Sequence, residues 1–520
     1  MNAPSLLPAF PPSTYSDAEV IAQLKQQLEV TSQRLQLSEL RVQLLEEKLR
    51  LQRIAKYGPG SEKLTSQQLE LLELEPGVSD LEVAAEGERE GLPPSSEKKK
   101  RKHPGRQTLP ASLPRVERVM ACTPEQSVCA GCGQATMLIG YEESEQLDVE
   151  PVKYYVLVTR REKRACKRCE EQGVAVAAVA ERILDKSLVS DQIIIDTVVA
   201  KYCDSLPLYR QSAILKRDTG LEITRSTMTG WVMHVGELLL PVVSRMKKEL
   251  LAGTYIQADE TPVGVQTHDK RGKNHQGYLW QYGSPGGSVV FDFRMGRERE
   301  GPELFLGMYQ GLLQTDGYAA YDRVGGPKMV HACCLAHARR KFIDAVKLDA
   351  RDIASARIVG LMDELFALDA KARAEKMDHA QRDLLRKETA PAVLAELRTQ
   401  ILAVQKNVLQ KSAAGKAASY TLSLWSKLIL FLQYPELELS TNLAENSMRP
   451  VAIGRKNWIH LGSKEAGPKV AAIFSIVESC RRLGLPIREY LTATLPGLAN
   501  RSIQSLYQLT PAAYAQSRAQ

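Results

Sequence analysis

The stretch TYIQADETPV, residues 254–263, decides the fold class of this 520-residue chain. It is a short apolar run that leads to an acid, Asp259, and it is the first of five strand-like runs punctuated by glycine and proline. The other four runs are GYLWQYGS at 277–284, SVVFDFRMG at 288–296, GLLQTDGYAAY at 311–321 and PKMVHACCLAH at 327–337. A helix-like stretch, ELFLGMYQ at 303–310, precedes the fourth run.

Three strands in a meander, a helix, a strand, a short helix and a strand make the order of a ribonuclease-H-like sheet. The first and fourth strands are neighbours in such a sheet. We therefore expect Asp259, at the end of the first strand, and Asp316, at the end of the fourth, to emerge at one edge. Glu445 lies in TNLAENSMRPVAIGRKNW at 441–458, which we expect to form a helix across that edge.

Carboxylates gathered in this way suit hard divalent cations. Mg²⁺ prefers oxygen ligands and is usually held by few carboxylates together with water and substrate phosphate. Two such ions stabilise the attacking and leaving oxygens of an in-line phosphoryl displacement. Three other acids fit less well: Glu260 should face the opposite way by strand alternation, Asp322 lies beyond the strand end, and Glu478 sits in an apolar helix.

The predicted catalytic core is discontinuous, and its parts are residues 254–334 and 441–485. Residues 335–440 between them are rich in Ala, Leu, Lys and Glu and are predicted to form an α-helical insertion. Residues 486–520 are predicted to form a helical C-terminal tail, and the stretch 500–520 gives no functional signal. The fold class is therefore multidomain α+β.

A heptad repeat marks the N-terminal part of the chain, residues 17–56. Apolar residues fall at every seventh position, namely Ile21, Leu28, Leu35, Val42 and Leu49. This repeat favours a coiled coil that self-associates. The alternative is a surface helix that packs on its own domain.

Acidic and basic residues occupy separate parts of the predicted disordered linker at 57–118. Residues 62–97 carry ten acids and two bases, and residues 98–118 carry eight bases and one acid. The basic arm could neutralise DNA phosphates with release of counterions, or it could be a solvated linker. Its candidate DNA-binding residues are Lys98, Lys99, Lys100, Arg101, Lys102 and Arg106.

Two Cys-x2-Cys knuckles define a predicted zinc-binding domain at residues 119–180. The four thiols, which suit a closed tetrahedral structural Zn²⁺ site in a zinc ribbon, are Cys129, Cys132, Cys166 and Cys169. The sequence between the knuckles alternates like a strand, so a hairpin could carry the second knuckle back to the first. Free structural thiols are the alternative, and Cys122 has no partner at knuckle spacing.

Residues 185–250 are predicted to be helical, with a helix-turn-helix pattern. The turn is expected at Thr219-Gly220, and the second helix should begin at Thr224 or Ser226 as N-cap. The candidate base-contacting residues near its start are Arg225, Ser226 and Thr227. An ordinary helical pair is the alternative reading.

The composition is that of an ordinary soluble protein, with 44% hydrophobic and 25% charged residues. The net charge of +8 is compatible with a polyanionic partner without requiring one. No long apolar run predicts a membrane span, and the N-terminus lacks the pattern of a signal peptide. We therefore expect a cytoplasmic protein whose nine cysteines are thiols or metal ligands.

Taken together, these stretches resemble the IS66 family of bacterial insertion-sequence transposases, which are of the DDE (Asp-Asp-Glu) type. The resemblance runs in order over roughly residues 55–490. The matching stretches are YGPGSEKL, KKKRKHPGRQTLPASLPR, the two knuckles, PLYRQ with the WV of the next helix, QADETPV, TDGYAAY, CLAHARRKF and NLAENSMRPVAIGRKNWIHLGS. Two departures are Asn446, where the family commonly has Arg, and Pro59, where it usually has a polar or small residue.

The resemblance implies a transposase that binds terminal inverted repeats, cuts the 3′ end of each strand with water and joins the freed 3′-OH to target DNA. It assigns the triad to Asp259, Asp316 and Glu445, with Asp259 bridging two Mg²⁺ or Mn²⁺ ions and the others completing one site each. The implied partners are double-stranded DNA (element ends and target), further copies of the chain and accessory proteins of the element. The implied location is the bacterial nucleoid.

Basic and aromatic residues near the acids fit the same function as DNA contacts. They are His337, Arg339, Arg340, Arg449, Arg455, Lys456 and Trp458. His337 is more often a structural or supporting residue than a metal ligand, and Trp458 could stack on a flipped base or pack in the core. A DNA-binding regulator and a ribonuclease-H-like nuclease are the competing functions.

Overall fold

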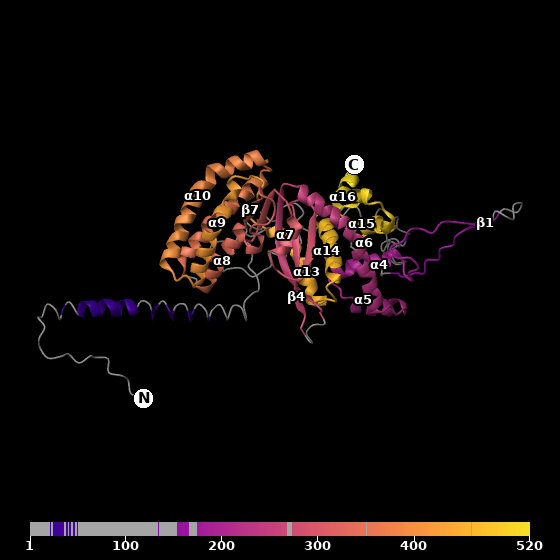
Figure 1. Ribbon diagram of the computed structural model, residues 1–520, viewed down its shortest axis with the longest axis horizontal. Helices are drawn as coiled ribbons and strands as arrows, with labels where there is room; N and C mark the ends of the chain where they lie inside the picture. Colours follow the sequence, from indigo (N-terminus) through magenta and orange to yellow (C-terminus); the bar gives the residue numbers. More distant parts are fainter. Residues whose placement is uncertain are drawn as a thin grey trace, which may run out of the picture. The chain divides into compact units, whose positions relative to one another are not determined.

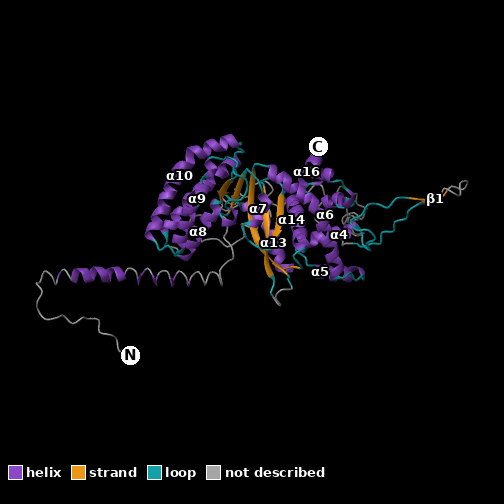
Figure 2. Cartoon of the chain, viewed as in Figure 1, coloured by secondary structure: helices purple, strands orange, loops and turns teal. Residues whose placement is uncertain are grey.

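We describe the fold from a computed structural model of the chain (Figures 1 and 2). Two compact units are distinguished, Pro93–Arg160 and the rest of the chain, Met1–Leu92 with Arg161–Gln520. The structure describes residues 21, 24–35, 38–39, 41–42, 45–46, 49, 134, 153–165, 174–267, 273–349, 351–458 and 460–519. The predicted linker with its basic arm, and the four cysteines of the predicted zinc site, lie outside these residues.

The described residues between 21 and 49 are all helical, so the helix predicted in this region is confirmed where the structure describes it. The heptad side chains are exposed; they are Ile21, Leu28, Leu35, Val42 and Leu49. An apolar stripe on an exposed helix calls for a partner surface. Self-association through this stripe stays a prediction.

A six-stranded sheet has the strand order β5-β4-β3-β6-β7, with β8 beside the far end of β3. The strands are β3 (Tyr255–Val265), β4 (His275–Gly283), β5 (Val289–Arg294), β6 (Leu312–Thr315), β7 (Val330–Cys333) and β8 (His460–Leu461). β3, β4 and β5 form the predicted antiparallel meander, and β6 pairs parallel with both β3 and β7. The predicted adjacency of the first and fourth strands is therefore confirmed.

Two short helical connections complete the predicted order. α7 (Glu300–Leu306) precedes β6, and the 3-10 helix η2 (Ala319–Tyr321) lies between β6 and β7. The end of the first strand was predicted wrongly. Asp259 lies in the middle of β3, because the strand pairs with β4 as far as Val265.

Successive residues of β3 face two different hydrophobic cores. Ile256 and Ala258 belong to a first core that contains residues of α6 (Arg225–Ala252) and α14 (Ala466–Arg482). Tyr255 belongs to a second core built with the helices of residues 335–440. This is the alternation expected of a strand that is covered on both faces. Asp259 and Glu260 continue it and are directed to opposite faces of the sheet.

The edge strand β5 is covered by α14 (Ala466–Arg482). Ser479 Oγ accepts a hydrogen bond from Val289 N (2.8 Å) and donates one to Val289 O (2.9 Å). Ser475 Oγ accepts one from Phe291 N (2.8 Å). An edge strand otherwise exposes unpaired backbone groups, so these serines protect it as well as fix the helix.

Three helices precede the sheet: α4 (Asp191–Tyr202), α5 (Leu208–Thr219) and α6 (Arg225–Ala252). α5 ends at Gly220, whose φ of 75° is readily adopted only by glycine. α6 begins after Thr224, whose side chain accepts a hydrogen bond from Thr227 N (3.2 Å). The predicted turn and the N-cap at Thr224 are confirmed. α6 packs against α14, where Lys469 donates to Glu237 (2.8 Å).

Residues 335–440 are mainly helical, as predicted. The helices are α8 (Leu335–Leu348), α9 (Ile353–Ala374), α10 (His379–Asn407), α11 (Ala413–Ser423), α12 (Trp425–Leu428) and the 3-10 helix η3 (Leu430–Leu432). They appear in orange tones to the left of the sheet in Figure 1 and pack on one another around the second core.

A buried ion cluster joins these helices to the chain that returns to the sheet. Asp369 of α9 accepts hydrogen bonds from Arg386 (2.7 and 2.9 Å) and Arg382 (2.8 Å) of α10. Arg386 also donates to the carbonyl oxygen of Leu437 (2.8 Å), and Arg382 donates to Glu438 (3.0 Å). Buried charges persist when they are paired and hydrogen-bonded in this way.

Residues 433–441, the return segment, lead from the insertion back to the sheet. They are followed by α13 (Asn442–Trp458), α14, α15 (Ile487–Thr494), the 3-10 helices η4 (Leu498–Asn500) and η5 (Ile503–Leu509), and α16 (Pro511–Ala519). The predicted helical tail is thus confirmed as helical. It packs on the first core, where Tyr490 OH donates to Leu509 O (2.5 Å).

A second, two-stranded antiparallel sheet pairs β1 (Lys163–Ala165) with β2 (Val174–Val176). The connection between these strands contains Cys166 and Cys169.

In the described part of the chain, no helix is long and apolar enough to cross a bilayer.

Removing the anion of the buried ion cluster should destabilise the protein strongly. Asp369→Ala leaves Arg382 and Arg386 buried beside each other, and breaking a buried pair in this way costs about 3–5 kcal/mol. Asp383→Ala on the same helix as these arginines is the matched control. It removes an exposed pair with Lys387 that contributes about 0.3–0.5 kcal/mol. Thermal and urea unfolding measure both, and equal losses of stability would contradict the assignment.

Candidate active site

The register of β3 against β6 aligns the two aspartates. Gln257 pairs with Gln314 in this parallel ladder, and the same register carried two residues further sets Asp259 level with Asp316. Asp316 directly follows the last residue of β6, Thr315. Its Oδ1 accepts a hydrogen bond from Tyr318 N (2.8 Å), which fixes the carboxylate at the strand end.

Beside Asp259, β3 changes its neighbour. β6 pairs with β3 only as far as Gln257, and β8 begins to pair with it only at Gly264. In between, among the described residues, no strand pairs with this side of β3. Arg455 of α13 occupies part of it by donating to Thr261 Oγ1 (3.0 Å) and to the carbonyl oxygen of Pro262 (2.5 Å).

Glu445 lies in the first turn of α13, which packs against β3 and β4. Its backbone N–H donates to Thr441 O (3.0 Å). Its side chain lies between two groups from α8: Arg340 Nη2 donates to Oε2 (3.2 Å), and His337 Nε2 lies 3.5 Å from Oε1. The helical insertion thus supplies the cationic neighbours of the third acid.

The negative charges of neighbouring acids disfavour the ionised form of Asp259. Burial raises the pKa of Asp259 to about 8, and the negative charges of Glu445 and Glu260 contribute to this rise. His337 shows the complementary effect. Burial opposes its charge, but Cys334 and Glu445 together raise its pKa to about 9. A site that disfavours its own carboxylates in this way favours added positive charge.

Glu260 faces away from Asp259 and has its own partners. Its carboxylate accepts hydrogen bonds from Arg297 Nη2 (2.6 Å) and from Tyr321 OH (2.9 Å). Burial raises the pKa of Glu260, although these two partners oppose the rise and Asp316 adds to it. Arg297 in turn stacks over the ring of Tyr318 at 3.9 Å. The sequence-based exclusion of Glu260 from the triad is consistent with this environment.

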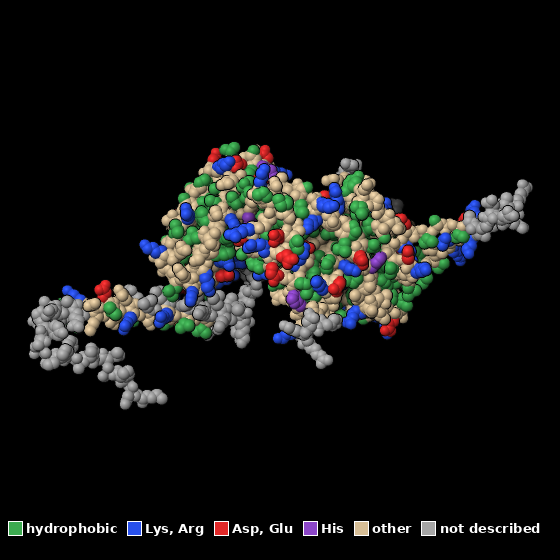
Figure 3. All heavy atoms as spheres, in the orientation of Figure 1, with side chains coloured by type: hydrophobic (Ala, Val, Ile, Leu, Met, Phe, Trp, Pro, Cys, Tyr) green, Lys and Arg blue, Asp and Glu red, His purple; other side chains and the backbone are tan. Residues whose placement is uncertain are grey.

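The chemistry of the three acids fits hard divalent cations, although the acids do not form a closed cage. Among the described residues, no three His, Cys, Asp or Glu side chains are grouped closely enough to hold a metal by themselves. Mg²⁺ does not need such a cage, because it keeps several waters and takes substrate phosphate as a ligand. Figure 3 shows acidic side chains gathered near the middle of one face, with lysines and arginines around them.

The structure corrects one predicted DNA contact and favours one of the two alternatives for another. Arg339 is buried, with 2% of its surface exposed, and forms a two-point ion pair with Asp363 of α9 (2.7 and 3.0 Å). The prediction that Arg339 contacts DNA is therefore wrong, because its guanidinium fastens α8 to α9. The ring of Trp458 packs against the first core with the ammonium of Lys201 5.5 Å from its centre, which favours core packing over base stacking.

The remaining predicted contacts are more accessible. On α13, Arg449 and Arg455 are half-buried and Lys456 is exposed. At the start of α6, the side chains of Arg225, Ser226 and Thr227 are exposed. Glu478, by contrast, is buried with Arg482 (2.9 Å) in α14 and has a packing role.

Sequence reasoning missed three buried polar residues, Tyr255, Gln257 and Gln314. Both aspartates follow a glutamine by two residues, in QAD at 257–259 and QTD at 314–316. This repeated spacing was a signal, because it puts each glutamine on the same strand face as its aspartate. Arg297 was also missed, and no sequence pattern links it to Glu260, 37 residues earlier.

The raised pKa of Asp259 predicts a pH dependence of stability in metal-free protein. The carboxyl of Asp259 has a pKa of about 3.9 in the unfolded chain and of about 8 in the folded protein. Between these values the folded state keeps a proton that the unfolded state has lost, so stability falls as pH rises. Asp259→Asn should therefore flatten the fall in unfolding temperature between about pH 5 and 8.

Asp322→Asn is the control for this experiment. Burial tends to raise the pKa of Asp322, but Lys427 lowers it overall, so this carboxyl contributes no fall in stability over the range. The variant should keep the wild-type slope in EDTA. A wild-type slope in Asp259→Asn would contradict the assigned environment of Asp259.

Comparison with known proteins shows three matches to family models. The model described as Transposase IS66 family matches residues 186–469, more than half of the chain. The zinc-finger binding domain of transposase IS66 matches residues 126–170, and Transposase C of IS166 homeodomain matches residues 44–118. The first match contains all three acids, and the second contains all four cysteines of the two knuckles.

The chain is also similar to proteins of Sinorhizobium fredii. It is 32% identical to the uncharacterized protein y4qI over 82% of this chain and 79% of the relative. It is 31% identical to the uncharacterized protein y4jD over 78% of this chain and 81% of the relative. The family matches and these similarities extend over most of the chain, which therefore belongs to the IS66 family of transposases.

Proposed function

We propose that this transposase has a ribonuclease-H-like core and cuts and joins DNA strands with Asp259, Asp316 and Glu445 as its catalytic acids. The observation that supports the proposal best is the β3–β6 register, which, carried two residues beyond Gln257 and Gln314, sets Asp259 level with Asp316. The third acid comes from α13, which packs across β3 and β4. Five strands in the order β5-β4-β3-β6-β7, with β3, β6 and β7 parallel, agree with such a core.

The proposed reaction cuts the 3′ ends of the element with water and then uses each 3′-OH to attack target DNA. Two Mg²⁺ or Mn²⁺ ions held by the three acids would stabilise the attacking and leaving oxygens of this displacement. Arg340 is half-buried beside Glu445, where its guanidinium can also bind phosphate through charge-assisted hydrogen bonds. α9 and α11 pack against α8, which carries this arginine.

Recognition of the element ends is proposed for α5 and α6. The turn at Gly220 and the cap at Thr224 present the first turn of α6 with Arg225, Ser226 and Thr227 exposed. Side chains in this position of a helix-turn-helix can reach base edges in the major groove. The basic arm over 98–106 would add affinity through phosphate contacts.

The four knuckle cysteines are proposed to hold a structural Zn²⁺. The antiparallel pairing of β1 with β2 supports this, because the second knuckle lies in the sequence that connects these strands. The match to the IS66 zinc-finger domain covers the same residues. Assembly of more than one chain is proposed for the exposed heptad stripe, and accessory proteins of the element are further candidate partners.

Loss of any catalytic acid should abolish cleavage and joining while DNA binding remains. We expect Asp259→Ala, Asp316→Ala and Glu445→Ala each to lose activity by on the order of 10²–10³-fold or more, as when a preorganised charged group is removed. Strand-transfer assays with element-end DNA and Mg²⁺ or Mn²⁺ measure this, and mobility shifts measure binding.

Asp322→Asn is the matched control here, since this acid also follows β6 but pairs with Lys427. It should keep nearly full activity. Activity that survives Glu445→Ala would show that another acid completes the triad. Binding without any cleavage by the wild type would indicate either a missing accessory protein or a regulator.

The zinc proposal has a separate test. Purified protein should contain about one zinc ion per chain, since four thiolates complete a tetrahedral site. Cys132→Ser should lose this zinc, whereas Cys122→Ser should keep it. Elemental analysis by mass spectrometry measures both variants, and full zinc content in Cys132→Ser would refute the ligand assignment.

A further inference from the structure

Two glutamines lie buried side by side beneath the proposed acids. Gln257 of β3 and Gln314 of β6 are register partners, and each is no more than 2% exposed. Tyr255 lies two residues before Gln257 on the same face of β3. Alternation also puts Asp259 and Asp316 on this face, directly beyond the glutamines. The polar side chains thus lie between the second core and the two aspartates.

These three side chains are joined by hydrogen bonds into one network, which we name the glutamine network. Tyr255 OH donates to Gln314 Oε1 (2.5 Å) and accepts from Gln257 Nε2 (3.0 Å). Gln257 Nε2 also lies 3.1 Å from Gln314 Oε1. Because all three groups are buried, each bond is shielded from water and constrains the direction of its partner.

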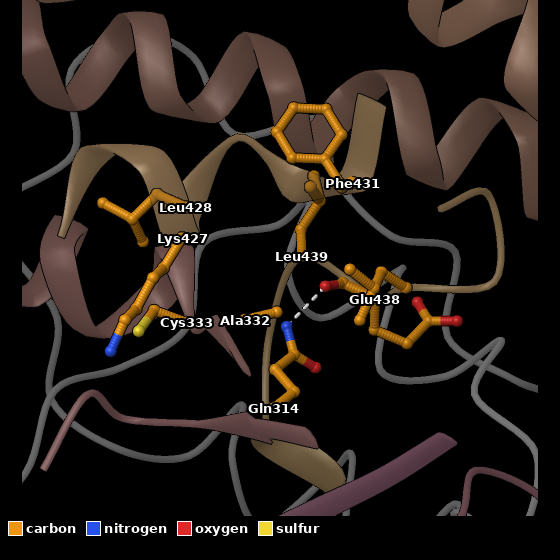
Figure 4. Close-up of a pocket in the computed structure, with 9 residues that line it drawn as sticks. Gln314, Ala332, Cys333, Lys427, Leu428, Phe431, Glu438 and Leu439 are labelled. Carbon is orange, nitrogen blue, oxygen red and sulfur yellow. Dashed lines mark hydrogen bonds between the residues drawn. The ribbon is translucent and has the colours of Figure 1, made fainter. Parts of the chain in front are cut away.

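The glutamine network also holds the segment that carries the chain back to Glu445. Gln257 Nε2 donates to Ser440 O (3.1 Å), and Gln314 Nε2 donates to Glu438 O (2.6 Å). Figure 4 shows the second bond, with the Gln314 amide directed at the backbone of Glu438. Tyr255 OH accepts a further bond from Glu438 N (3.2 Å).

This return segment leads into α13 without a break. Thr441 follows Ser440, and its carbonyl oxygen accepts the hydrogen bond from the backbone N–H of Glu445 (3.0 Å). The helix start is therefore fixed by residues adjacent to the network contacts. On the other side, the insertion holds the same segment, because Arg382 binds the carboxylate of Glu438.

Packing alone does not require these amides. The neighbours of Tyr255 in the second core are mostly apolar, and an apolar side chain of similar volume would fill the same space without the cost of burying an amide. What the amides add is directional hydrogen bonds. Gln257 joins β3, which contains Asp259, to the segment that precedes Glu445, and Gln314 joins β6, which Asp316 follows, to the same segment.

We propose that Tyr255, Gln257 and Gln314 are positioning residues that fix Glu445 relative to Asp259 and Asp316. The inference rests on the proposed function, because it assumes that these three acids act together. It goes further by giving the helical insertion a role in the site: its arginines and the glutamine network hold the return segment from opposite sides.

The test uses full-length protein with two variants and one control. Gln257→Met keeps the length of the side chain and removes the amide, and Tyr255→Phe removes only the hydroxyl. Ser479→Ala is the matched control, since it removes a buried tie between α14 and β5 on the same sheet. Amide hydrogen exchange, the Mn²⁺ dependence of the unfolding temperature, and kcat and KM for end cleavage are the readouts.

Exchange in metal-free protein tests the network independently of catalysis. Both variants should speed exchange of residues 438–446 by about tenfold or more, as when a buried hydrogen bond is lost from a locally opening segment. Ser479→Ala should leave this segment unchanged. Wild-type exchange of residues 438–446 in both variants would overturn the proposal, whatever the activity of the protein.

The other readouts separate positioning from a purely structural role. Positioning predicts that both variants need several-fold more Mn²⁺ for half of the unfolding-temperature shift and that kcat falls while KM for DNA is unchanged. Faster exchange with wild-type Mn²⁺ dependence and kcat would also overturn it. If the wild type neither responds to Mn²⁺ nor cleaves DNA, the proposed function fails, and faster exchange would still support the network as the tether of α13.

Discussion

The parallel pairing of β3 with β6 is the contact on which the rest of the molecule depends. It spans only Tyr255–Gln257 against Leu312–Gln314, yet it brings the two aspartates level and is where the two hydrophobic cores meet across the sheet. A slip of one residue would turn each side chain to the other face. The buried amides on this ladder make such a slip costly, because their partners lie on one face only.

Charge around the proposed site is balanced by groups from several parts of the chain. Arg340 and His337 of the insertion face Glu445, and Arg297 from the loop after β5 faces Glu260. These cationic groups offset part of the negative charge of Glu445 and Glu260 before any metal ion or DNA binds. The insertion and the sheet therefore meet at the acids as well as in the second core, which contains Tyr255 and Leu312 of the sheet.

Much of the fold could be predicted, because alternation, glycine punctuation and capping are local signals. The strand order, the neighbouring first and fourth strands and the cap at Thr224 followed from them. The continuation of β3 could not, because Pro262 indicates a strand end. The carbonyl oxygen of Pro262 faces Arg455, on the side of β3 where no described strand pairs. An N–H at this residue would point to the same side, so its absence removes no hydrogen bond of the sheet. The partners of Arg339 and Gln257 lie 24 and 183 residues away, beyond the reach of any local pattern.

The return segment also has a consequence for the order in which the molecule is built. Gln257 leaves the ribosome 183 residues before Ser440, its backbone partner, and all helices of the insertion are synthesised in between. Contacts this distant in sequence carry a high loop-closure entropy until the intervening chain has folded. The folded insertion shortens that loop, because Leu335 N donates to Leu439 O (2.9 Å) and so joins its two ends. Contacts between Glu445 and the sheet can therefore form only after α4, α5, α6 and strands β3 to β7 have been synthesised.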